Sequence, residues 1–337
     1  MKTNQIRNAL LLLLTATIWG VAFVAQSVGN GYVGPFTFNA VRFFLGGIVL
    51  LPLLFWRNKT LYQKETQEEK KARWRMTLRG GICCGLALGC ASQLQQMGIL
   101  NTTVAKAGFI TAMYIVIVPL LGLLFHKKVR GIVWGAVVLA VFGMYLLCIQ
   151  GSFSLEKGDF YVLCGAFVFS IHILVIDYFS PKADSVALSC IQFFVSSIVC
   201  GIGMLLTETV SISAILEGWM PILYAGVMSC GVAYTLQVVG QKGVDPTVVS
   251  LILSLESVIS LIAGWILLGQ ALNFKEICGC VIMFMAIILV QLPERKNRYK
   301  NAQIKLEKLH KKKEPVQRLK KCGKAVDNAE CANYNSV

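Results

Sequence analysis

The chain has 337 residues, of which 56% are hydrophobic and only 15% carry a charged side chain. Soluble domains have about 25% charged residues, so this composition excludes an ordinary soluble globular protein. The net charge of +15 is typical of a nucleic-acid-binding protein, but the basic residues lie in short stretches between apolar runs, without a basic face that carries base-reading side chains. We therefore interpret the charge as a signal of membrane topology.

Ten apolar segments are each long enough to cross a bilayer as a helix, since about 20 residues span the roughly 30 Å hydrocarbon layer. The first five are expected at residues 8–28, 35–55, 76–98, 103–125 and 129–149. The second five are expected at residues 158–179, 185–206, 219–240, 246–268 and 274–292. The predicted fold class is an all-α polytopic membrane protein with ten transmembrane helices.

Lysine and arginine concentrate in every second connection between these segments. Of the 32 Lys and Arg residues, only Lys157 and Lys275 fall in the connections expected outside, and Arg42 and Lys106 lie within the segments themselves. Because cytoplasmic loops are enriched in Lys and Arg, we expect both termini on the cytoplasmic side of a bacterial inner membrane.

The two halves of the chain show weak internal similarity. Two constant offsets in numbering bring identical pairs together: Phe43-Phe44 with Phe193-Phe194, and Thr103-Val104 with Thr247-Val248. An odd number of helices per repeat makes the second repeat enter the membrane from the opposite side, as in many secondary transporters. We expect two inverted five-helix repeats, over residues 1–150 and 151–292, and a basic, disordered cytoplasmic tail over residues 293–337.

Several residues in the apolar segments form a pattern found in one transporter family. They are Ile18-Trp19-Gly20 in the first segment, Pro35 and Arg42 in the second, Pro119 in the fourth, and Gly135, Gly143 and Gly279 in the fifth and tenth. On these residues the chain resembles the EamA-type branch of the drug/metabolite transporter superfamily over residues 8–292. The resemblance implies a central cavity lined by helices one, three, four, six, eight and nine, with metabolites or amino acids as substrates.

One family feature is absent from the sequence. Members of the family often end the fourth and ninth helices with Gly-Glu, where this chain has Phe125-His126 and Gly269-Gln270. A role for that carboxylate therefore does not carry over.

Glu256 lies near the middle of the ninth segment, between Ser254 and Ser257. A charge in the hydrocarbon layer costs about 2.5–3.5 kcal/mol on insertion scales, so its presence needs a reason. It either binds a cationic group or carries a coupling proton, or it ties helices together as a neutral or paired side chain. We expect it to be the principal polar contact of a solute site.

Three further charged or titratable side chains fall within the segments. Arg42 lies in the outer half of the second segment, which the resemblance places away from the cavity, so we expect it to be a structural tie to backbone carbonyls. Lys106 begins the fourth segment and either extends to the outer interface or forms an outer-gate contact. His172 is a third candidate for a gate or a structural charge.

Uncharged polar side chains gather in the third and eighth segments. The third carries Gln93, Gln95 and Gln96, and the eighth carries Tyr234 and Gln237. Such groups either replace the hydration shell of a solute or join helices by hydrogen bonds worth about 0.6 kcal/mol. We select Gln93, Tyr234 and Gln237 for the solute site, because Gln93 and Gln96 share a helix face and Gln95 points elsewhere.

Trp19 and Tyr114 complete the candidate solute site. Their rings could stack on an aromatic or cationic solute, and packing is the alternative interpretation. The third segment also carries Gly81, Gly85 and Gly89 on one face, a spacing that lets two helices approach closely. We interpret this glycine stripe as a packing surface, with dimerisation as the less favoured use.

Enzymatic chemistry finds little support in the sequence. On a helix, His172 and Asp177 point about 140° apart, so they do not form one site. The single pair Cys278-x-Cys280 has no second pair at zinc-binding spacing, and no Walker-type glycine loop is present. We therefore expect no catalytic residues, no metal and no cofactor.

The sequence as a whole predicts a secondary transporter that moves a small metabolite, an amino acid or a similar organic solute, by alternating access, as an exporter or permease. Its partners are the solute, the lipid bilayer and a candidate coupling proton, without nucleic acid; the oligomeric state is left open. The alternatives are a lipid or lipid-linked-sugar translocator and, less favoured, a membrane-embedded enzyme.

Overall fold

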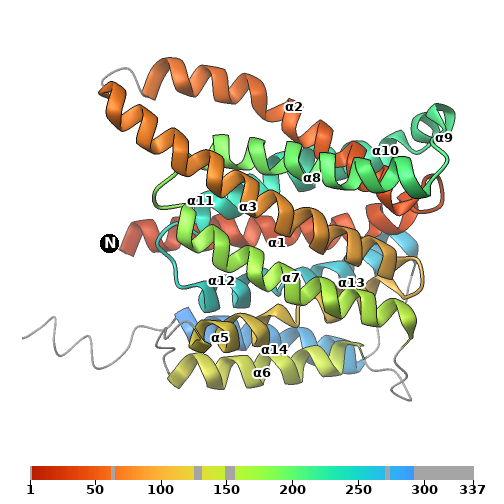
Figure 1. Cartoon of the computed structure of the whole chain (residues 1–337). Coiled ribbons are helices and arrows are strands. Elements are labelled where there is room, and N and C mark those ends of the chain that lie inside the picture. Colours follow the sequence, from red (N-terminus) through yellow and green to blue (C-terminus); the bar gives the residue numbers. More distant parts are fainter. Residues whose placement is uncertain (1, 62–64, 125–130, 149–155, 270–273, 292–337) are drawn as a thin grey trace, which may run out of the picture. The chain divides into compact units, whose positions relative to one another are not determined.

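The structure is a computed structural model in which the described residues are 2–61, 65–124, 131–148, 156–269 and 274–291. Every regular element within these ranges is a helix (Figure 1). The chain up to Val290 forms one compact unit. The expected tail over residues 293–337 lies outside the described residues, as do His126 and Gln270.

The helices follow the chain in two groups. The first group comprises α1 (Lys2–Gly29), α2 (Pro35–Leu61), α3 (Gln67–Ile99), α4 (Val104–Thr111), α5 (Tyr114–Leu124) and α6 (Gly131–Cys148). The second group comprises α7 (Lys157–Phe179), α8 (Ser185–Thr207), α9 (Ile212–Glu217), α10 (Trp219–Leu223), η1 (Tyr224–Tyr234), α11 (Thr235–Gly240), α12 (Pro246–Leu253), α13 (Glu256–Leu268) and α14 (Phe274–Gln291).

Seven helical segments within the described residues are long and apolar enough to cross a membrane. They are Gln5–Gly29, Pro35–Arg57, Val104–Leu124, Lys157–Phe179, Ser185–Thr207, Trp219–Gly240 and Pro246–Leu267. The described residues of the other three expected spans are helical as well. Two contain shorter apolar helices, Gly131–Gly143 and Ile277–Leu289, and the third, α3, is long but carries three glutamines in its C-terminal part.

Two expected spans are broken near their middle. We predicted continuous helices over residues 103–125 and 246–268, but the first divides into α4 and α5 and the second into α12 and α13. At both breaks the backbone forms tight bonds to the third residue back, from Met113 N to Ile110 O (3.1 Å) and from Ser257 N to Ser254 O (3.1 Å). Tyr114 and Glu256 are the first residues after these breaks.

A row of serines accompanies the break between α12 and α13. Each hydroxyl donates to the carbonyl three residues back: Ser250 to Thr247, Ser254 to Leu251, Ser257 to Ser254 and Ser260 to Ser257, all at 2.7–2.9 Å. Serine hydroxyls that bond to the preceding turn compete with the backbone ladder and bend helices. The serines therefore give a physical reason for the discontinuity.

The eighth expected span also departs from a regular α-helix. It consists of the short α10, the π-helical η1 and the short α11. Segments of π-helix are rare and often occur at functional sites. Ser229 lies in the middle of η1 and Tyr234 is its last residue, and both are buried.

Helices α2 and α8 form an antiparallel pair that is tied at both ends. At one end Arg57 bonds to Asp184 at 3.2 Å. At the other, the carboxylate of Glu208 accepts hydrogen bonds from the backbone N–H groups of Phe36 and Thr37, both at 2.8 Å, and thereby caps the start of α2.

The middle of this pair shows a reciprocal pattern of contacts. Phe43 stacks on Phe193, with ring centroids 6.3 Å apart. On either side of the ring pair, Ser197 donates to the Ala40 carbonyl at 2.9 Å and the Cys190 thiol donates to the Gly47 carbonyl at 3.6 Å. The offset that aligns Phe43 with Phe193 also aligns residue 40 with 190 and residue 47 with 197.

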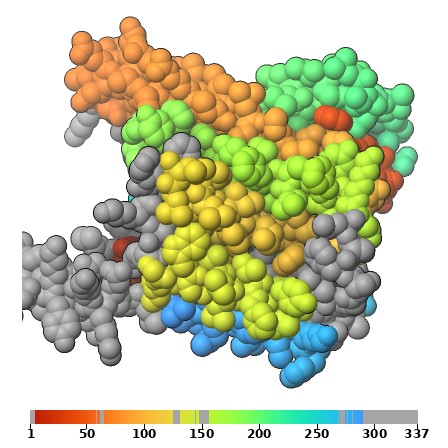
Figure 2. Space-filling model, turned by 60° about the horizontal axis from the view of Figure 1, so that its bottom comes forward, coloured from red at the N-terminus to blue at the C-terminus, as the bar shows by residue number. Residues whose placement is uncertain are grey.

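The glycine stripe of α3 packs against α8 within the same chain. A Cβ on Gly81 would lie 2.6 Å from Ile191, and one on Gly85 would lie 2.6 Å from Val195. The prediction of a packing surface is confirmed for this pair of helices. Elsewhere, α6 and α14 lie side by side along one face (Figure 2), where Gly143 approaches the Gly279 carbonyl.

Candidate functional site

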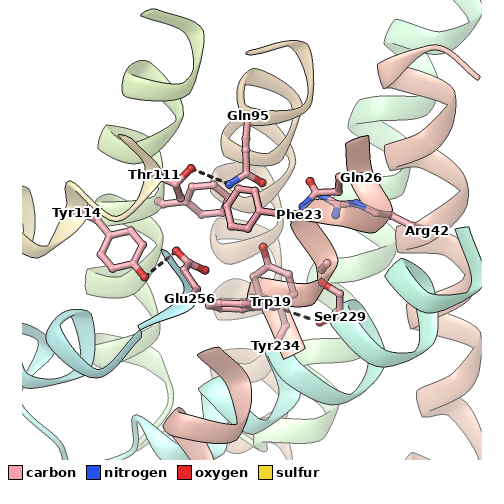
Figure 3. A pocket seen from close by; sticks show the side chains of 12 residues that line it. Trp19, Phe23, Gln26, Arg42, Gln95, Thr111, Tyr114, Ser229, Tyr234 and Glu256 are labelled. Atoms are coloured by element: carbon pink, nitrogen blue, oxygen red, sulfur yellow. Dashed lines mark hydrogen bonds between the residues drawn. The ribbon is translucent and has the colours of Figure 1, made fainter. Parts of the chain in front are cut away.

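A cavity lies between the helices, about 30 Å³ in volume. Its wall consists of Trp19, Ala22, Phe23, Gln26, Arg42, Gln95, Thr111, Tyr114, Phe169, Ser229, Tyr234 and Glu256 (Figure 3). These residues come from α1, α2, α3, α4, α5, α7, η1 and α13. The resemblance implied all of these helices except α2, which contributes Arg42.

Glu256 and Tyr114 are neighbours in the cavity wall and point toward each other (Figure 3). The Tyr114 hydroxyl donates a hydrogen bond of 2.8 Å to Glu256 Oε1, and both side chains are buried. Glu256 begins α13, where the positive end of the helix dipole favours a carboxylate. The two breaks thus bring a phenol and an acid from distant parts of the sequence into one polar pair.

Two aromatic rings form the floor of the cavity in Figure 3. The ring centroids of Trp19 and Tyr234 are 4.5 Å apart, and Trp19 Nε1 donates to the Ser229 carbonyl of η1 at 3.4 Å. That carbonyl belongs to the π-helical segment, so the irregular backbone helps to orient Trp19. The structure brings four of the six predicted solute contacts into one cavity: Trp19, Tyr114, Tyr234 and Glu256.

The glutamines of α3 have different roles from those we predicted. Gln95 lines the cavity and donates to the Thr111 hydroxyl at 3.0 Å. Gln93 instead accepts a hydrogen bond of 2.9 Å from Asn39 and does not line the cavity. Gln93 and Gln95 are two positions apart and point about 160° from each other, so the choice of face decided which glutamine reaches the cavity.

Gln237 and His172 are buried behind the cavity wall. Gln237 is in α11, and its side chain does not line the cavity. His172 Nε2 lies 3.2 Å from Gln192 Oε1, and its ring contacts Tyr234 edge-on. His172 therefore supports the wall through Tyr234, and neither residue lines the cavity.

The surroundings of Arg42 differ more from the prediction than those of the other candidate residues. It lines the cavity, with Cζ lying 4.9 Å from the ring centroid of Phe43 and 5.6 Å from that of Phe38. The expected tie to backbone carbonyls is not made by Nε or Nη2, which have no hydrogen-bond partner among the described residues. The side chain is long enough to reach inward from α2, which sequence position alone did not indicate.

Lys106 lies outside the cavity wall and joins α4 to α7. Its ammonium lies 2.6 Å from Asp159, which also accepts a hydrogen bond of 2.7 Å from Thr102. This ion pair is compatible with the predicted gate contact, but its partner is a protein carboxylate. Among the described residues, no cluster of three or more His, Cys, Asp or Glu side chains could hold a metal ion.

The sequence also contained a signal for two cavity residues that we did not select. Phe23 and Gln26 follow Trp19 by four and seven positions on α1, the spacing of one helix face. Phe169, Thr111 and Ser229 showed no comparable signal, because small polar and aromatic residues are frequent in apolar helices.

The chain is similar to a family of known transporters. A model described as the EamA-like transporter family matches residues 6–149 and again residues 156–292. An uncharacterized transporter of Archaeoglobus fulgidus is 28% identical over 287 residues, with 83% of this chain and 84% of the relative covered. An uncharacterized transporter of Methanothermobacter thermautotrophicus is 23% identical over 293 residues, with 82% and 84% covered.

A solved crystal structure has a similar fold. It matches with a TM-score of 0.66 at 16% sequence identity, over 84% of this chain and 96% of that chain. At this identity the likeness describes the fold alone.

Proposed function

Because the chain belongs to the EamA-like transporter family, we propose that it is a secondary transporter that moves a small organic metabolite by alternating access. It is a multi-pass membrane protein, as the family and the seven apolar helices of the described residues indicate. The proposed solute is an amino acid or a similar metabolite, and the proposed direction is export. The relatives' names describe transporters, in agreement with a role without catalysis.

The proposed architecture is ten transmembrane helices in two inverted repeats, over residues 1–150 and 151–292. The family model matches once in each of these parts, and the reciprocal contacts around Phe43 and Phe193 are those that a two-fold relation between the repeats would produce. We further propose a bacterial inner membrane as the location, with both termini and the basic tail cytoplasmic, from the distribution of Lys and Arg.

The observation that carries the proposed function is the Tyr114–Glu256 pair at the breaks of two helices. Secondary transporters form their central sites from discontinuous helices whose ends point at the solute. We propose Glu256 as the principal polar contact, which also carries a proton if transport is proton-coupled, and Trp19, Tyr114 and Tyr234 as the walls of the solute pocket. Gln93 joins α3 to α2 through Asn39, and Gln237 lies outside the cavity wall.

The size of the cavity supports a cycle in which it opens and closes. A volume of about 30 Å³ holds only a few water molecules, because one water needs roughly 10–15 Å³. An organic solute therefore enters only when the surrounding helices separate. The breaks in α4–α5 and α12–α13 are places where such a movement requires little disruption of backbone hydrogen bonds.

The proposal is tested with purified full-length protein in liposomes. Thermal-shift screening against amino acids, nucleosides, sugars and organic cations selects a solute, and counterflow of that solute measures transport. We expect Glu256→Gln to reduce transport and change its pH dependence, and the same change at the exposed Glu217 to have no effect. Unchanged rate and pH dependence in Glu256→Gln would exclude Glu256 from the site.

A further inference from the structure

Arg42 is a cation in the cavity wall, and two of its nitrogens have no oxygen acceptor in the part of the chain that the structure describes. The residue is only 1% exposed. Its Nε and Nη2 donate no hydrogen bond to any described residue, and the ion pairs of the described residues do not include it. A buried charge is costly unless it is paired and hydrogen-bonded. The missing partner is therefore expected from a molecule that enters the cavity.

The two unpartnered nitrogens indicate the chemistry of that partner. Nε and Nη2 lie on one edge of the guanidinium, where their N–H groups are parallel and match the two oxygens of a carboxylate. The contacts with Phe38 and Phe43 hold the cation by its interaction with the rings. They supply no oxygen acceptor, so the two donors remain available.

The charge balance of the wall favours a monovalent anion. Arg42 is the only Lys or Arg among the residues that line the cavity, and Glu256 lines the same cavity from the other side in Figure 3. With Arg42 and Glu256 in one wall, a carboxylate adds a single negative charge, which an ammonium group on the same solute offsets. A phosphate group with nearly two negative charges would leave an excess of negative charge in a wall that already contains Glu256.

A second polar group on the solute finds an acceptor at Glu256. Its Oε1 accepts from Tyr114, and a carboxylate has a second oxygen that can accept a further hydrogen bond. The rings of Trp19 and Tyr234, tilted against each other at a centroid distance of 4.5 Å, form the floor of the cavity between Glu256 on one side and Arg42 on the other in Figure 3. The cavity wall thus carries three kinds of group: the cation of Arg42, the aromatic surface of Trp19 and Tyr234, and the acid Glu256.

We propose that Arg42 binds the anionic group of the transported solute and that this group is a carboxylate. The hydrocarbon part of the solute then lies on Trp19 and Tyr234, and an ammonium or hydroxyl group donates to Glu256. This inference rests on the proposed transport function and adds the residue that recognises the anion. Both nitrogens become accessible when the cavity expands to admit the solute.

The first test needs no knowledge of the solute. If the charge of Arg42 is paired only when a ligand is bound, replacing Arg42 with a neutral side chain removes an uncompensated buried charge from the ligand-free protein. We expect purified Arg42→Gln and Arg42→Met to have thermal unfolding midpoints equal to or above that of the unaltered protein in detergent, without ligand. Arg79→Gln, at an exposed position of α3, is the control. A lower midpoint in both Arg42 variants, with Arg79→Gln unchanged, would show a structural role and overturn the inference.

The second test measures recognition of the carboxylate with matched probes. L-Phenylalanine and L-leucine are compared with their amides, with the acids that lack the amino group, with the amines that lack the carboxylate, and with inorganic phosphate. We expect the compounds with a carboxylate to raise the thermal unfolding midpoint of the protein and to be exchanged across the liposome membrane. Loss of the carboxylate should weaken binding roughly 10- to 100-fold. Arg42→Gln should remove that difference, and Arg42→Lys should restore part of it, because it keeps the charge without the paired donors.

The outcomes separate this inference from the transport function. Exchange of a probe without a carboxylate, equal in the unaltered protein and in Arg42→Gln, overturns the inference and leaves the transport function intact. Preference for phosphate over every carboxylate also overturns it. If no compound in either screen binds or crosses the liposome membrane, the proposed function fails, and the inference fails with it.

Discussion

The hydroxyl of Tyr114 donates a 2.8 Å hydrogen bond to the carboxylate of Glu256, and each residue is the first of a helix that follows a break. The bond therefore joins the two discontinuities to each other, although they are far apart in the sequence. We therefore expect the two breaks to be energetically coupled through this side-chain contact.

The energetic coupling between these two residues is measurable. In a double-mutant cycle of Tyr114→Phe and Glu256→Gln, we expect a coupling energy of about 0.6 to 1.7 kcal/mol, the range of interhelical hydrogen bonds in membrane proteins. Unfolding of the purified protein in mixed micelles gives the four free energies. Additive effects of the two changes would show that the hydrogen bond does not contribute to stability.

The contact between α3 and α8 depends on the absence of a side chain at Gly85. A methyl group there would lie 2.6 Å from Val195 Cβ and 2.8 Å from the Gln192 carbonyl. We expect Gly85→Ala to reduce stability by about 1–3 kcal/mol, the usual cost of overpacking, and to lower the unfolding temperature.

A matched glycine on α8 serves as the control for this substitution. A Cβ on Gly201 has no atom within 4 Å outside its own helix, and alanine is the better helix former. Gly201→Ala should therefore leave the unfolding temperature unchanged or raise it. A similar loss of stability in both variants would show that Gly85 does not determine the spacing between α3 and α8.

The cap on α2 is supplied by a residue distant in sequence. Glu208 accepts from the Phe36 and Thr37 backbone N–H groups and from the Thr37 hydroxyl at 2.7–2.8 Å. Hydrogen bonds to a charged acceptor contribute about 1.5–3 kcal/mol each, so Glu208→Ala should lower stability by at least one such amount. Glu217→Ala, at an exposed position, should change it by less than about 0.5 kcal/mol. Equal effects of the two changes would contradict the capping role.

Replacing the glutamines of α3 one at a time tests which face of this helix is turned toward the cavity. Gln95→Leu alters the cavity wall and removes the donor to Thr111, so we expect it to change the KM of the transported solute and also to lower the unfolding temperature. Gln93→Leu removes the acceptor of Asn39 and should lower the unfolding temperature with an unaltered KM. Liposome counterflow and thermal unfolding measure the two effects, and the opposite pattern would show that Gln93 is the residue facing the solute.

The positions of the helices could be predicted because an apolar run of suitable length leaves few alternatives in a bilayer. The breaks could not, since hydropathy is the same for a regular turn and for one tightened to the third residue back. The serines from Ser250 to Ser260 carried the relevant information, because their hydroxyls bond to carbonyls. Their spacing of three and four was visible in the sequence, but it is also that of an ordinary helix face.

The site was predicted less completely than the fold. Glu256, Trp19, Tyr114 and Tyr234 could be selected because polar or amphipathic side chains are costly or uncommon within a membrane helix. The choice between Gln93 and Gln95 required the rotation of α3 about its axis, which apolar content does not determine. Arg42 was assigned to the wrong surroundings because a long side chain can reach a cavity from a helix whose backbone lies behind it.

The reciprocal contacts of α2 and α8 have a consequence for how this chain could specialise. Under the proposed repeat, Ala40 meets Ser197 as Gly47 meets Cys190, which is the isologous pattern of a two-fold dimer interface. Two identical half-length subunits would place the same residue at both equivalent positions. One covalent chain does not have this restriction: it carries Arg42 in the cavity wall and, at the matching position, the neutral Gln192 against His172. Joining the halves thus permits one guanidinium in place of two.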